Sequence, residues 1–383
     1  MRMLTAGAAL AAYERITDQR SRFVRVDELC ASAAQDLQGF MASEAELRAE
    51  AGLMLKDKKG LEAAQGRFLG HVLADPAAGA HLCHAMLLPH PKSKARLAEF
   101  EQTGVLALAG ARVERQGKAA VITLQNPRHL NAEDETTLEG TEIAVDVALL
   151  DPKSEVCVLR GGTVTNPKHA GKRLFGAGIN LTHLYQGKIR YLWYLLRDLG
   201  FVNKIFRGVA SEHHSPEETS TEKLWIAAVE GFAIGGHCQI LLAIDYTVAA
   251  DDAYLTLPAR KEGIIPGAAN LRLPRFVGDR IARQAILAEL RIDCASEAGR
   301  LVCDEIVPAA KMDEALARVI ERLSGSGIVS AAGNRRAFRA GEEPLDAFRR
   351  YMAVYAREQA QCHFSPALIA NLERHWNAAN RRS

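Results

Sequence analysis

Two glycine-rich turns hold the residues of this sequence that are best suited to chemistry. The first covers residues 175–180 (Phe-Gly-Ala-Gly-Ile-Asn) and the second covers residues 231–239 (Gly-Phe-Ala-Ile-Gly-Gly-His-Cys-Gln), and each precedes a helical pattern. The first N–H groups of a helix lack partners within it and lie at the positive end of its dipole. Two such helix starts that converge on one oxygen atom would stabilise negative charge there. A single turn of this kind is more often a cap or a packing feature, so the turns alone do not decide the function.

The elements that must position these turns alternate between strands and helices. Short, apolar segments rich in β-branched residues predict strands at 119–124, 156–159, 224–229, 246–250 and 254–257. Helical patterns lie between them at 133–150, 181–208 and 237–244, and another begins at about residue 278. Strands that alternate with helices indicate an α/β domain.

Helical patterns flank this region on both sides. Residues 1–108 are rich in alanine, leucine and charged residues, and Ser43 and Glu46 form the pattern of a capping box. The chain returns to helices from Lys311 onward. We therefore expect a helical N-terminal domain at 1–108, an α/β domain at 109–325 and a helical C-terminal segment at 326–383. The N-terminal part shows no pattern for chemistry, and packing and assembly are its expected roles.

The composition is that of a globular protein without a strongly charged partner. The chain has 383 residues, of which 48% are hydrophobic and 25% charged, and its net charge of +2 favours neither nucleic acid nor a membrane surface. No apolar run approaches the roughly 18 residues of a spanning helix, and residues 1–20 lack the pattern of a secretory signal. The seven cysteines are scattered without a C-x-x-C pair, which indicates reduced thiols. We expect a cytoplasmic protein.

Three groups of potential metal ligands occur, but none is complete. The pairs are His81 with His84, His213 with His214, and His237 with Cys238. A metal site usually needs three or four ligands, and no further ones accompany these pairs. We therefore expect no bound catalytic metal, and packing or surface positions for these histidines.

Four motifs in order resemble the crotonase (enoyl-CoA hydratase/isomerase) superfamily. They are residues 126–132 (Asn-Pro-Arg-His-Leu-Asn-Ala), 175–181 (Phe-Gly-Ala-Gly-Ile-Asn-Leu), 230–236 (Glu-Gly-Phe-Ala-Ile-Gly-Gly) and 263–268 (Gly-Ile-Ile-Pro-Gly-Ala). The resemblance covers about residues 112–325. It implies a ββα spiral core, an acyl-CoA substrate and a homo-oligomer, either a trimer or a dimer of trimers.

The resemblance also implies roles for individual residues. The backbone N–H groups of Ile179 and Gly236 match the oxyanion donors that hold the thioester carbonyl, where each donor can contribute about 3 to 4 kcal/mol. Arg128, Lys172 and Arg173 match the places that receive the CoA nucleotide, and their side chains could pair with its phosphates. Solvated loop charges are the alternative for these three residues.

Two departures from the family pattern bear on the reaction. Hydratases use two glutamates as acid and base, whereas the matching positions here hold Gln239 and Ala259. Neither side chain can exchange a proton with water as a carboxylate does. Ordinary enoyl-CoA hydration is therefore not expected.

The combination of Gly-Gly-His-Cys-Gln, the loop Phe-Gly-Ala-Gly-Ile-Asn-Leu-Thr-His and a helical extension resembles one group within the superfamily. These are the dihydroxyphenylacetyl-CoA dioxygenases of glycopeptide-antibiotic pathways. The resemblance implies a reaction without metal or flavin, in which the substrate carbanion passes electrons to O2 and CoA is expelled. A neutral Gln239 in an apolar pocket would suit it.

The same resemblance suggests which residues contact the substrate. Glu133 and Arg197 are candidates for the ring hydroxyls, with surface charges of a helix as the alternative. His169 and His237 are candidates for the CoA or acyl channel, or else structural histidines. The further residues expected at the substrate site are Ala177, Gly178, Asn180 and Cys238.

Two other functions compete with this interpretation. A hydrolase or isomerase for another acyl-CoA would share the oxyanion donors without using O2. A catalytically silent assembly protein would explain the two missing glutamates and the helical extension, but it would not need the oxyanion glycines. No pattern in the sequence identifies the base that removes the α-proton.

Overall fold

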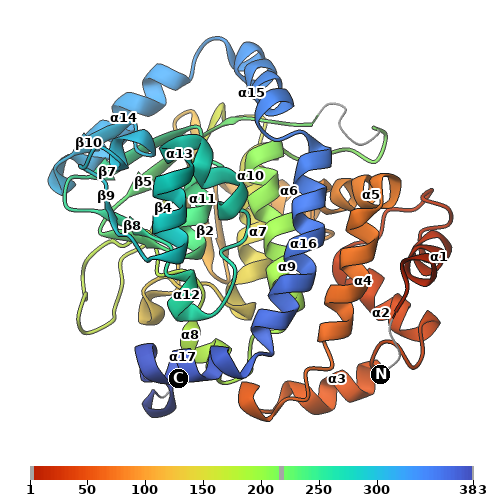
Figure 1. The fold of residues 1–383 in the computed structure, drawn as a ribbon. Coiled ribbons are helices and arrows are strands. Elements are labelled where there is room, and N and C mark those ends of the chain that lie inside the picture. The colour runs from red at the N-terminus through yellow and green to blue at the C-terminus, as the bar shows by residue number, and fades with distance from the viewer. Residues whose placement is uncertain (1–3, 215–219, 382–383) are drawn as a thin grey trace.

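The computed structural model describes residues 4–214 and 220–381 and contains a large mixed β-sheet (Figure 1). This sheet has the strand order β1-β2-β3-β4-β5-β7-β10, and a smaller sheet has the order β6-β8-β9. Strands β1 to β3 are antiparallel, whereas β3, β4, β5, β7 and β10 are parallel. The strands are β1 Val105–Leu108, β2 Ala111–Gln116, β3 Ala119–Leu124, β4 Val156–Gly161, β5 Leu224–Val229, β6 Phe232–Ile234, β7 Tyr246–Ala250, β8 Tyr254–Thr256, β9 Ile292–Asp293 and β10 Glu305–Val307.

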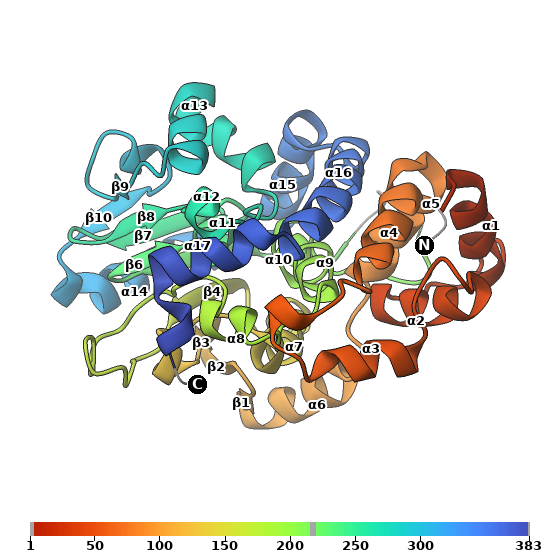
Figure 2. The same cartoon turned by 60° about the horizontal axis from the view of Figure 1, so that its bottom comes forward.

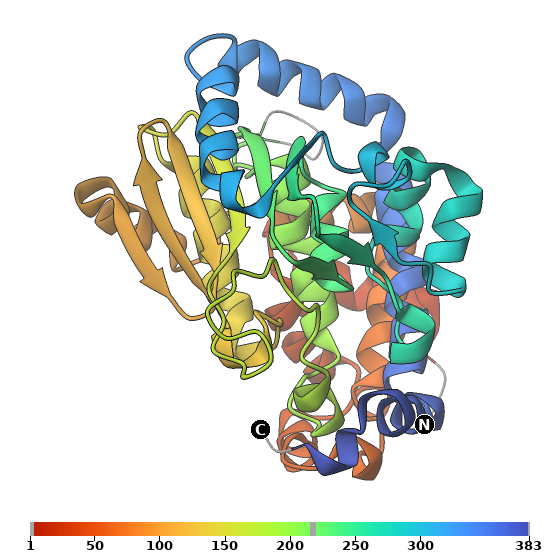
Figure 3. The ribbon, with the colours of Figure 1, turned by 90° about the vertical axis from the view of Figure 1, so that its left-hand side faces the viewer.

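The parallel strands form the centre of the core. Every residue of β4 is buried, and so is nearly every residue of β5, as expected for strands covered on both faces. Their register places Val158 beside both Val121 of β3 and Ile226 of β5. The antiparallel strands β1 to β3 lie at one edge, in gold in Figure 3. The predicted strands and the predicted α/β class are confirmed, but β1, β2, β6, β9 and β10 were not predicted.

One helical pattern was placed incorrectly. The stretch 181–208 is three helices, α8 Leu181–Tyr185, α9 Leu192–Leu199 and α10 Phe201–Arg207. The chain breaks at Gly187, where φ is +69°, and turns again at Gly200. Helix α13 spans Ala269–Leu287, but its backbone is not helical at Gly278 (φ +75°, ψ +161°), so a helix does begin after Gly278 as predicted. The helical part before Gly278 was not predicted. Helix α7, Glu135–Leu150, agrees with its prediction and is capped by Asp134.

The N-terminal helices pack against the C-terminal part of the chain. The capping box is present, since Ser43 Oγ accepts from the Glu46 N–H and Glu46 accepts from the Ser43 N–H. Helix α16 lies along α4 and α5 (Figures 1 and 2). The helical run ends at Thr103, so residues 105–108 are strand β1 rather than helix. The division at residues 108 and 325 stays a prediction. The helices are α1 Ala6–Ile16, α2 Val26–Asp36, α3 Glu44–Ala51, α4 Ala63–Ala74, α5 Pro76–Leu87, α6 Ser93–Thr103, α11 Gly236–Leu241, α12 Ala259–Glu262, α14 Met312–Leu323, α15 Ile328–Glu342, α16 Leu345–His363 and α17 Pro366–Trp376.

Across residues 4–214 and 220–381, no helix is both long and apolar enough to cross a membrane. All seven cysteines are free thiols, six of them buried and Cys362 partly buried.

A buried carboxylate between α15 and α16 provides a test of the C-terminal packing. Glu343 pairs with Arg272 (2.9 Å), Arg275 (3.0 Å) and Arg207 (3.2 Å), and its side chain is inaccessible to solvent. Burial raises the pKa of the Glu343 carboxyl, but the charge and hydrogen bonds of Arg272 and the charges of Arg207 and Arg275 outweigh this and lower the pKa to about 2. The ionised form is therefore the one that stabilises the fold.

We expect Glu343→Gln to lower the free energy of unfolding by about 3 to 5 kcal/mol at neutral pH, because it leaves buried arginines unpaired. Since the folded pKa lies below the unfolded value, this stability is present above about pH 4.3 and is lost as pH falls toward 2. Urea denaturation at several pH values measures the difference, with Glu342→Gln as a matched control on the exposed neighbour. Equal stability of wild type and Glu343→Gln at pH 7 would contradict the assignment.

Candidate active site

The two glycine-rich turns lie directly against each other. Gly176 donates to the Phe232 carbonyl (3.1 Å), and Ile234 donates back to the Gly176 carbonyl (3.0 Å). Further along, a Cβ on Gly178 would lie 2.8 Å from the Ile234 carbonyl oxygen and 3.1 Å from the Gly236 nitrogen, and Gly178 has φ +75°. A side chain at residue 178 would therefore be strained and would push the two turns apart.

The backbone N–H groups of Ile179 and Gly236 donate to no other residue in the described part of the chain. Gly236 is the first residue of α11, where no partner exists within the helix. Ile179 is fixed from both sides, since the Glu133 N–H donates to the Gly178 carbonyl (2.7 Å) and the Asn180 N–H donates to the Glu133 carbonyl (2.8 Å). Both N–H groups are thus free to donate to a bound molecule.

His237 supports the first turn from within the core. Its Nδ1 accepts the Gly178 N–H (3.0 Å), and its ring packs edge-to-face on Phe175. Burial lowers the pKa of His237 to about 4, although Glu133 raises it somewhat. The imidazole is therefore neutral, and because Nδ1 accepts, the proton is on Nε2. His237 therefore positions the Ala177–Gly178 peptide, one residue before the peptide that carries the Ile179 N–H.

Arg197 on α9 is the centre of a buried polar cluster. Its Nε and Nη2 form a two-point ion pair with Glu133 (2.8 and 2.9 Å). Its Nη1 donates to Asp198 (2.8 Å) and Gln239 Oε1 (2.6 Å), and Nη2 also donates to the Gly236 carbonyl (2.8 Å). These bonds use all five N–H donors of the guanidinium group. Arg197 could take a substrate hydroxyl only by releasing one of these partners.

The cluster has a consequence for the amide of Gln239. Arg197 can only donate, so the Gln239 oxygen must face it and the Gln239 NH2 group points elsewhere. That NH2 group has no acceptor among residues 4–214 and 220–381. Burial lowers the pKa of Arg197, but the charges of Glu133 and Asp198 raise it above its ordinary value, so it stays cationic. Gln239 is thereby held with its donor free.

Two neighbouring cavities adjoin these groups. The outer one has a volume of about 380 Å³ and the inner one about 20 Å³, which suits roughly one water-sized molecule. Both are lined by Ile179 and Glu262, which therefore mark their junction. Of the residues predicted from the sequence, the outer cavity is lined by Arg128, His169, Ala177, Ile179 and Asn180, and the inner one by Ile179, Arg197, Gly236 and Gln239.

The other predicted site residues do not line these cavities. Glu133, Gly178 and His237 lie behind the turns as described above. Cys238 is packed in the hydrophobic core, and Lys172 and Arg173 are exposed on the loop before the first turn. Their roles in substrate and CoA binding stay predictions.

Several lining residues were missed in the sequence. Lys261 and Glu262 come from α12, and His375 and Arg381 come from the C-terminal region, where α17 packs against α12. Nothing local distinguishes Glu262 from an ordinary helix-surface glutamate. The C-terminal residues lie far along the chain from the motifs, so only the fold brings them to the cavity.

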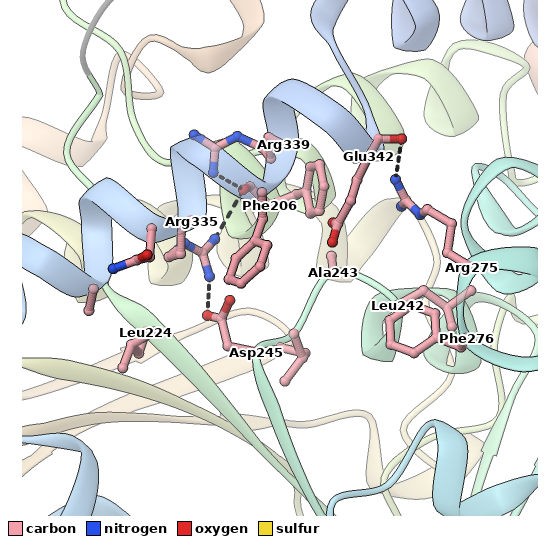
Figure 4. A pocket seen from close by; sticks show the side chains of 14 residues that line it. Phe206, Leu224, Leu242, Ala243, Asp245, Arg275, Phe276, Arg335, Arg339 and Glu342 are labelled. Atoms are coloured by element: carbon pink, nitrogen blue, oxygen red, sulfur yellow. Dashed lines mark hydrogen bonds and ion pairs between the residues drawn. The ribbon is translucent and has the colours of Figure 1, made fainter.

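A third cavity lies elsewhere, between α13, α15 and the ends of α10 and α11 (Figure 4). Its volume is about 420 Å³. Arg335 pairs there with Asp245 and donates to the Phe206 carbonyl (3.0 Å), as does Arg339 (3.0 Å). These bonds fasten α15 to the sheet domain, and the cavity shares no lining residue with the other two.

Comparison with known proteins identifies the family. The sequence profile described as enoyl-CoA hydratase/isomerase matches residues 114–361, which is more than half of the chain. The chain belongs to the enoyl-CoA hydratase/isomerase family. An enoyl-CoA hydratase from Bacillus halodurans shares the fold, with a TM-score of 0.58 at 20% identity over 69% of this chain and 99% of that one. The predicted crotonase-like fold is thus confirmed.

Two relatives within the family differ in how much of the chain they match. The (3,5-dihydroxyphenyl)acetyl-CoA 1,2-dioxygenase of Amycolatopsis orientalis is 46% identical over 349 residues, which cover 91% of this chain and 80% of that protein. A carnitinyl-CoA dehydratase of Citrobacter koseri is 28% identical over 241 residues, which cover 62% of this chain and 84% of that protein. Only the first of these two matches extends over nearly the whole chain.

Proposed function

We propose that this enzyme is a dioxygenase that converts 3,5-dihydroxyphenylacetyl-CoA and O2 into 3,5-dihydroxyphenylglyoxylate and CoA. The observation that carries the proposal is the 46% identity to a dioxygenase of this specificity over 91% of the chain. That match must include much of the helical N-terminal part, which lies outside the family profile at 114–361. The resemblance noted in the sequence leads to the same reaction.

The oxyanion donors explain how the first step becomes accessible. With the CoA portion in the outer cavity, the thioester oxygen can lie between the N–H groups of Ile179 and Gly236. Loss of an α-proton places enolate charge on that oxygen, and fixed donors stabilise it. Arg128 and His169 line the same cavity and are the groups proposed to contact CoA.

The substrate itself supplies the electrons for the reaction with O2. The carbanion, delocalised into the thioester and the ring, transfers electrons to O2 and forms a C–O bond to give a peroxide at the α-carbon. The distal peroxide oxygen attacks the thioester carbon and expels CoA thiolate. Cleavage of the O–O bond with loss of the second α-proton gives the keto and carboxylate groups. The small inner cavity beside Gln239 has the size for a diatomic molecule.

The polar cluster is proposed to recognise the ring hydroxyls. Gln239 offers a free NH2 group, and Glu133 is held in a fixed orientation by Arg197. An aromatic ring is larger than the inner cavity of about 20 Å³, so its binding must widen that cavity. We propose that Arg197 takes part in ring recognition chiefly by holding Glu133 and Gln239 in place.

We propose that no metal or organic cofactor takes part, because the carbanion can reduce O2 directly. Among residues 4–214 and 220–381 no group of three or more His, Cys, Asp or Glu side chains could hold a metal ion. A cytoplasmic location and a trimer or dimer of trimers stay predictions.

Incubation of the purified protein with 3,5-dihydroxyphenylacetyl-CoA under air tests the proposal. We expect O2 uptake and free CoA thiol to appear in equal amounts, and to persist after treatment with a chelator. Thiol release without O2 uptake would indicate a hydrolase instead. The absence of both O2 uptake and thiol release would favour a catalytically silent protein. Activity that a chelator abolishes and one metal ion restores would overturn the cofactor-free mechanism.

A further inference from the structure

We propose that Glu262 is the catalytic base that removes the α-proton of the acyl-CoA. This inference rests on the proposed dioxygenase function for its substrate, but the proton transfer itself can be measured without O2. Glu262 ends α12, a short helix that begins at Ala259. Its side chain lines both the outer and the inner cavity, and Ile179 is the other residue that does so.

The position of Glu262 places its carboxylate beside the proposed oxyanion site. A Cβ built on Gly235 would lie 3.7 Å from each carboxylate oxygen of Glu262, and Gly235 directly precedes the proposed donor Gly236. A thioester whose oxygen lies between Ile179 and Gly236 has its α-carbon two bonds from that oxygen. A base at the junction of the two cavities would therefore be within reach of the α-proton.

The other carboxylates near the inner cavity, and His237, already have partners. Glu133 and Asp198 are both paired with Arg197, at 2.8 to 2.9 Å. His237 has its Nδ1 engaged with the Gly178 N–H and does not line either cavity. Within the described residues, by contrast, the Glu262 carboxylate accepts no hydrogen bond and forms no ion pair. Because this carboxylate faces both cavities and no described side chain pairs with it, it is free to act on a bound molecule.

The electrostatic surroundings of Glu262 suit a base that works near neutral pH. Burial is the cause that raises its pKa, to about 7. A carboxylate with such a pKa is a stronger base than an exposed glutamate, yet it is still substantially ionised at neutral pH.

The location on α12 also bears on the missing glutamate of the family pattern. Ala259, which matches one of the two hydratase glutamates, and Glu262 are three residues apart, so they project from the same face of the helix. A carboxylate has thus been lost at one position and is present about one turn further along, at the junction of the cavities. This geometry serves abstraction from carbon without restoring the paired carboxylates that hydration needs.

The proposed proton transfer yields two products, the substrate enolate and a protonated Glu262. The α-C–H bond breaks, its electron pair stays on the substrate as the enolate, and the proton forms an O–H bond on Glu262. The oxygen of the enolate is held by Ile179 and Gly236. After CoA leaves, the same carboxylate, once it has released its proton to solvent through the outer cavity, can accept the second α-proton as the O–O bond breaks.

Hydrogen–deuterium exchange in the absence of O2 tests the inference. The wild-type protein in deuterated buffer should exchange the α-protons of 3,5-dihydroxyphenylacetyl-CoA, followed by NMR. Glu262→Gln should slow this exchange, and O2 uptake in air, by about 100-fold or more. Binding of the thioester, measured by calorimetry without O2, should change by less than about threefold, a bound we set for an isosteric change. Glu358→Gln, at an exposed position on α16, should match the wild type.

A second variant covers the case in which Glu262→Gln fails to fold. Glu262→Ala leaves space for a small carboxylic acid. Added formate should restore part of the α-proton exchange rate in this variant and should leave the exchange rate of the wild type unchanged. Wild-type exchange rates in Glu262→Gln would overturn the inference, as would Glu262→Ala that folds and exchanges at the wild-type rate without formate. If the wild type exchanges α-protons but consumes no O2, and Glu262→Gln does not exchange, Glu262 is confirmed as the base and the dioxygenase proposal fails.

Discussion

Replacement of Gly236 by proline should lower kcat by about 10²- to 10³-fold, which is the usual loss for one oxyanion donor. Proline has no N–H but is tolerated at the first position of a helix, which is the position of Gly236 in α11. The change therefore removes the proposed hydrogen bond to the thioester oxygen. The measurement is kcat for 3,5-dihydroxyphenylacetyl-CoA at saturating O2.

Gly236→Ala is the matched control for this prediction. A Cβ at residue 236 would lie 2.5 Å from Glu133 Oε2 and 3.0 Å from Arg197 Nη2, so either substitution disturbs the ion pair. Alanine keeps the N–H group. The further decrease in kcat from Gly236→Ala to Gly236→Pro therefore measures the contribution of this N–H donor alone. Equal activity of the two folded variants would show that the Gly236 N–H does not hold the developing oxyanion.

Glu133 should set the preference for the hydroxylated ring. A site built to bind hydroxyl groups rejects analogues that lack them by up to about 10⁴-fold, because its buried polar groups are left unpaired. Phenylacetyl-CoA should thus be a poor substrate. Glu133→Gln should reduce the difference in kcat/KM between the two thioesters, chiefly by lowering the value for the dihydroxy compound. The reason is that a neutral amide accepts a phenol proton less strongly than a carboxylate. The comparison is kcat/KM for both thioesters in both proteins.

The ion pair between Glu133 and Arg197 calls for a second variant. Asp198→Asn weakens another partner of the same arginine without touching Glu133. If both substitutions reduce the preference for the dihydroxy thioester equally, the effect is due to the altered position of Arg197 and not to a contact between Glu133 and the ring. If Glu133→Gln slows both thioesters by the same factor, Glu133 supports the fold or the CoA site, and ring recognition lies elsewhere.

The turns of the site could be predicted from the sequence because their chemistry is local. Glycines at 176, 178, 235 and 236 allow a close approach of the backbone, and the first three have a positive φ that other residues rarely adopt. The helix after each turn has its own pattern. The central strands were equally visible, since β3, β4 and β5 are continuous apolar runs.

The polar cluster and the junction of the cavities could not be predicted in the same way. Arg197 lies in a strongly amphipathic helical pattern, and nothing along the chain indicates that all five of its donors are used inside the protein. Glu262 follows the charged residues Arg260 and Lys261 in a short helix, as a solvated residue would. Its burial depends on α17, which packs on α12 from the far end of the chain. Long-range packing of this kind leaves no local pattern.

The measurement that tests the central claim most directly is a reaction in ¹⁸O2 with mass analysis of the product. The product should be trapped at once by borohydride reduction, because its keto oxygen exchanges with water. If the substrate carbanion reacts with O2 and the peroxide expels CoA, two labelled atoms from one O2 molecule appear in the trapped acid, and none comes from water. Formation of unlabelled dihydroxyphenylacetate in ¹⁸O2 would contradict the dioxygenase mechanism and indicate hydrolysis of the thioester. So would an acid that takes up its new oxygen from ¹⁸O-labelled water in a parallel reaction under ordinary O2.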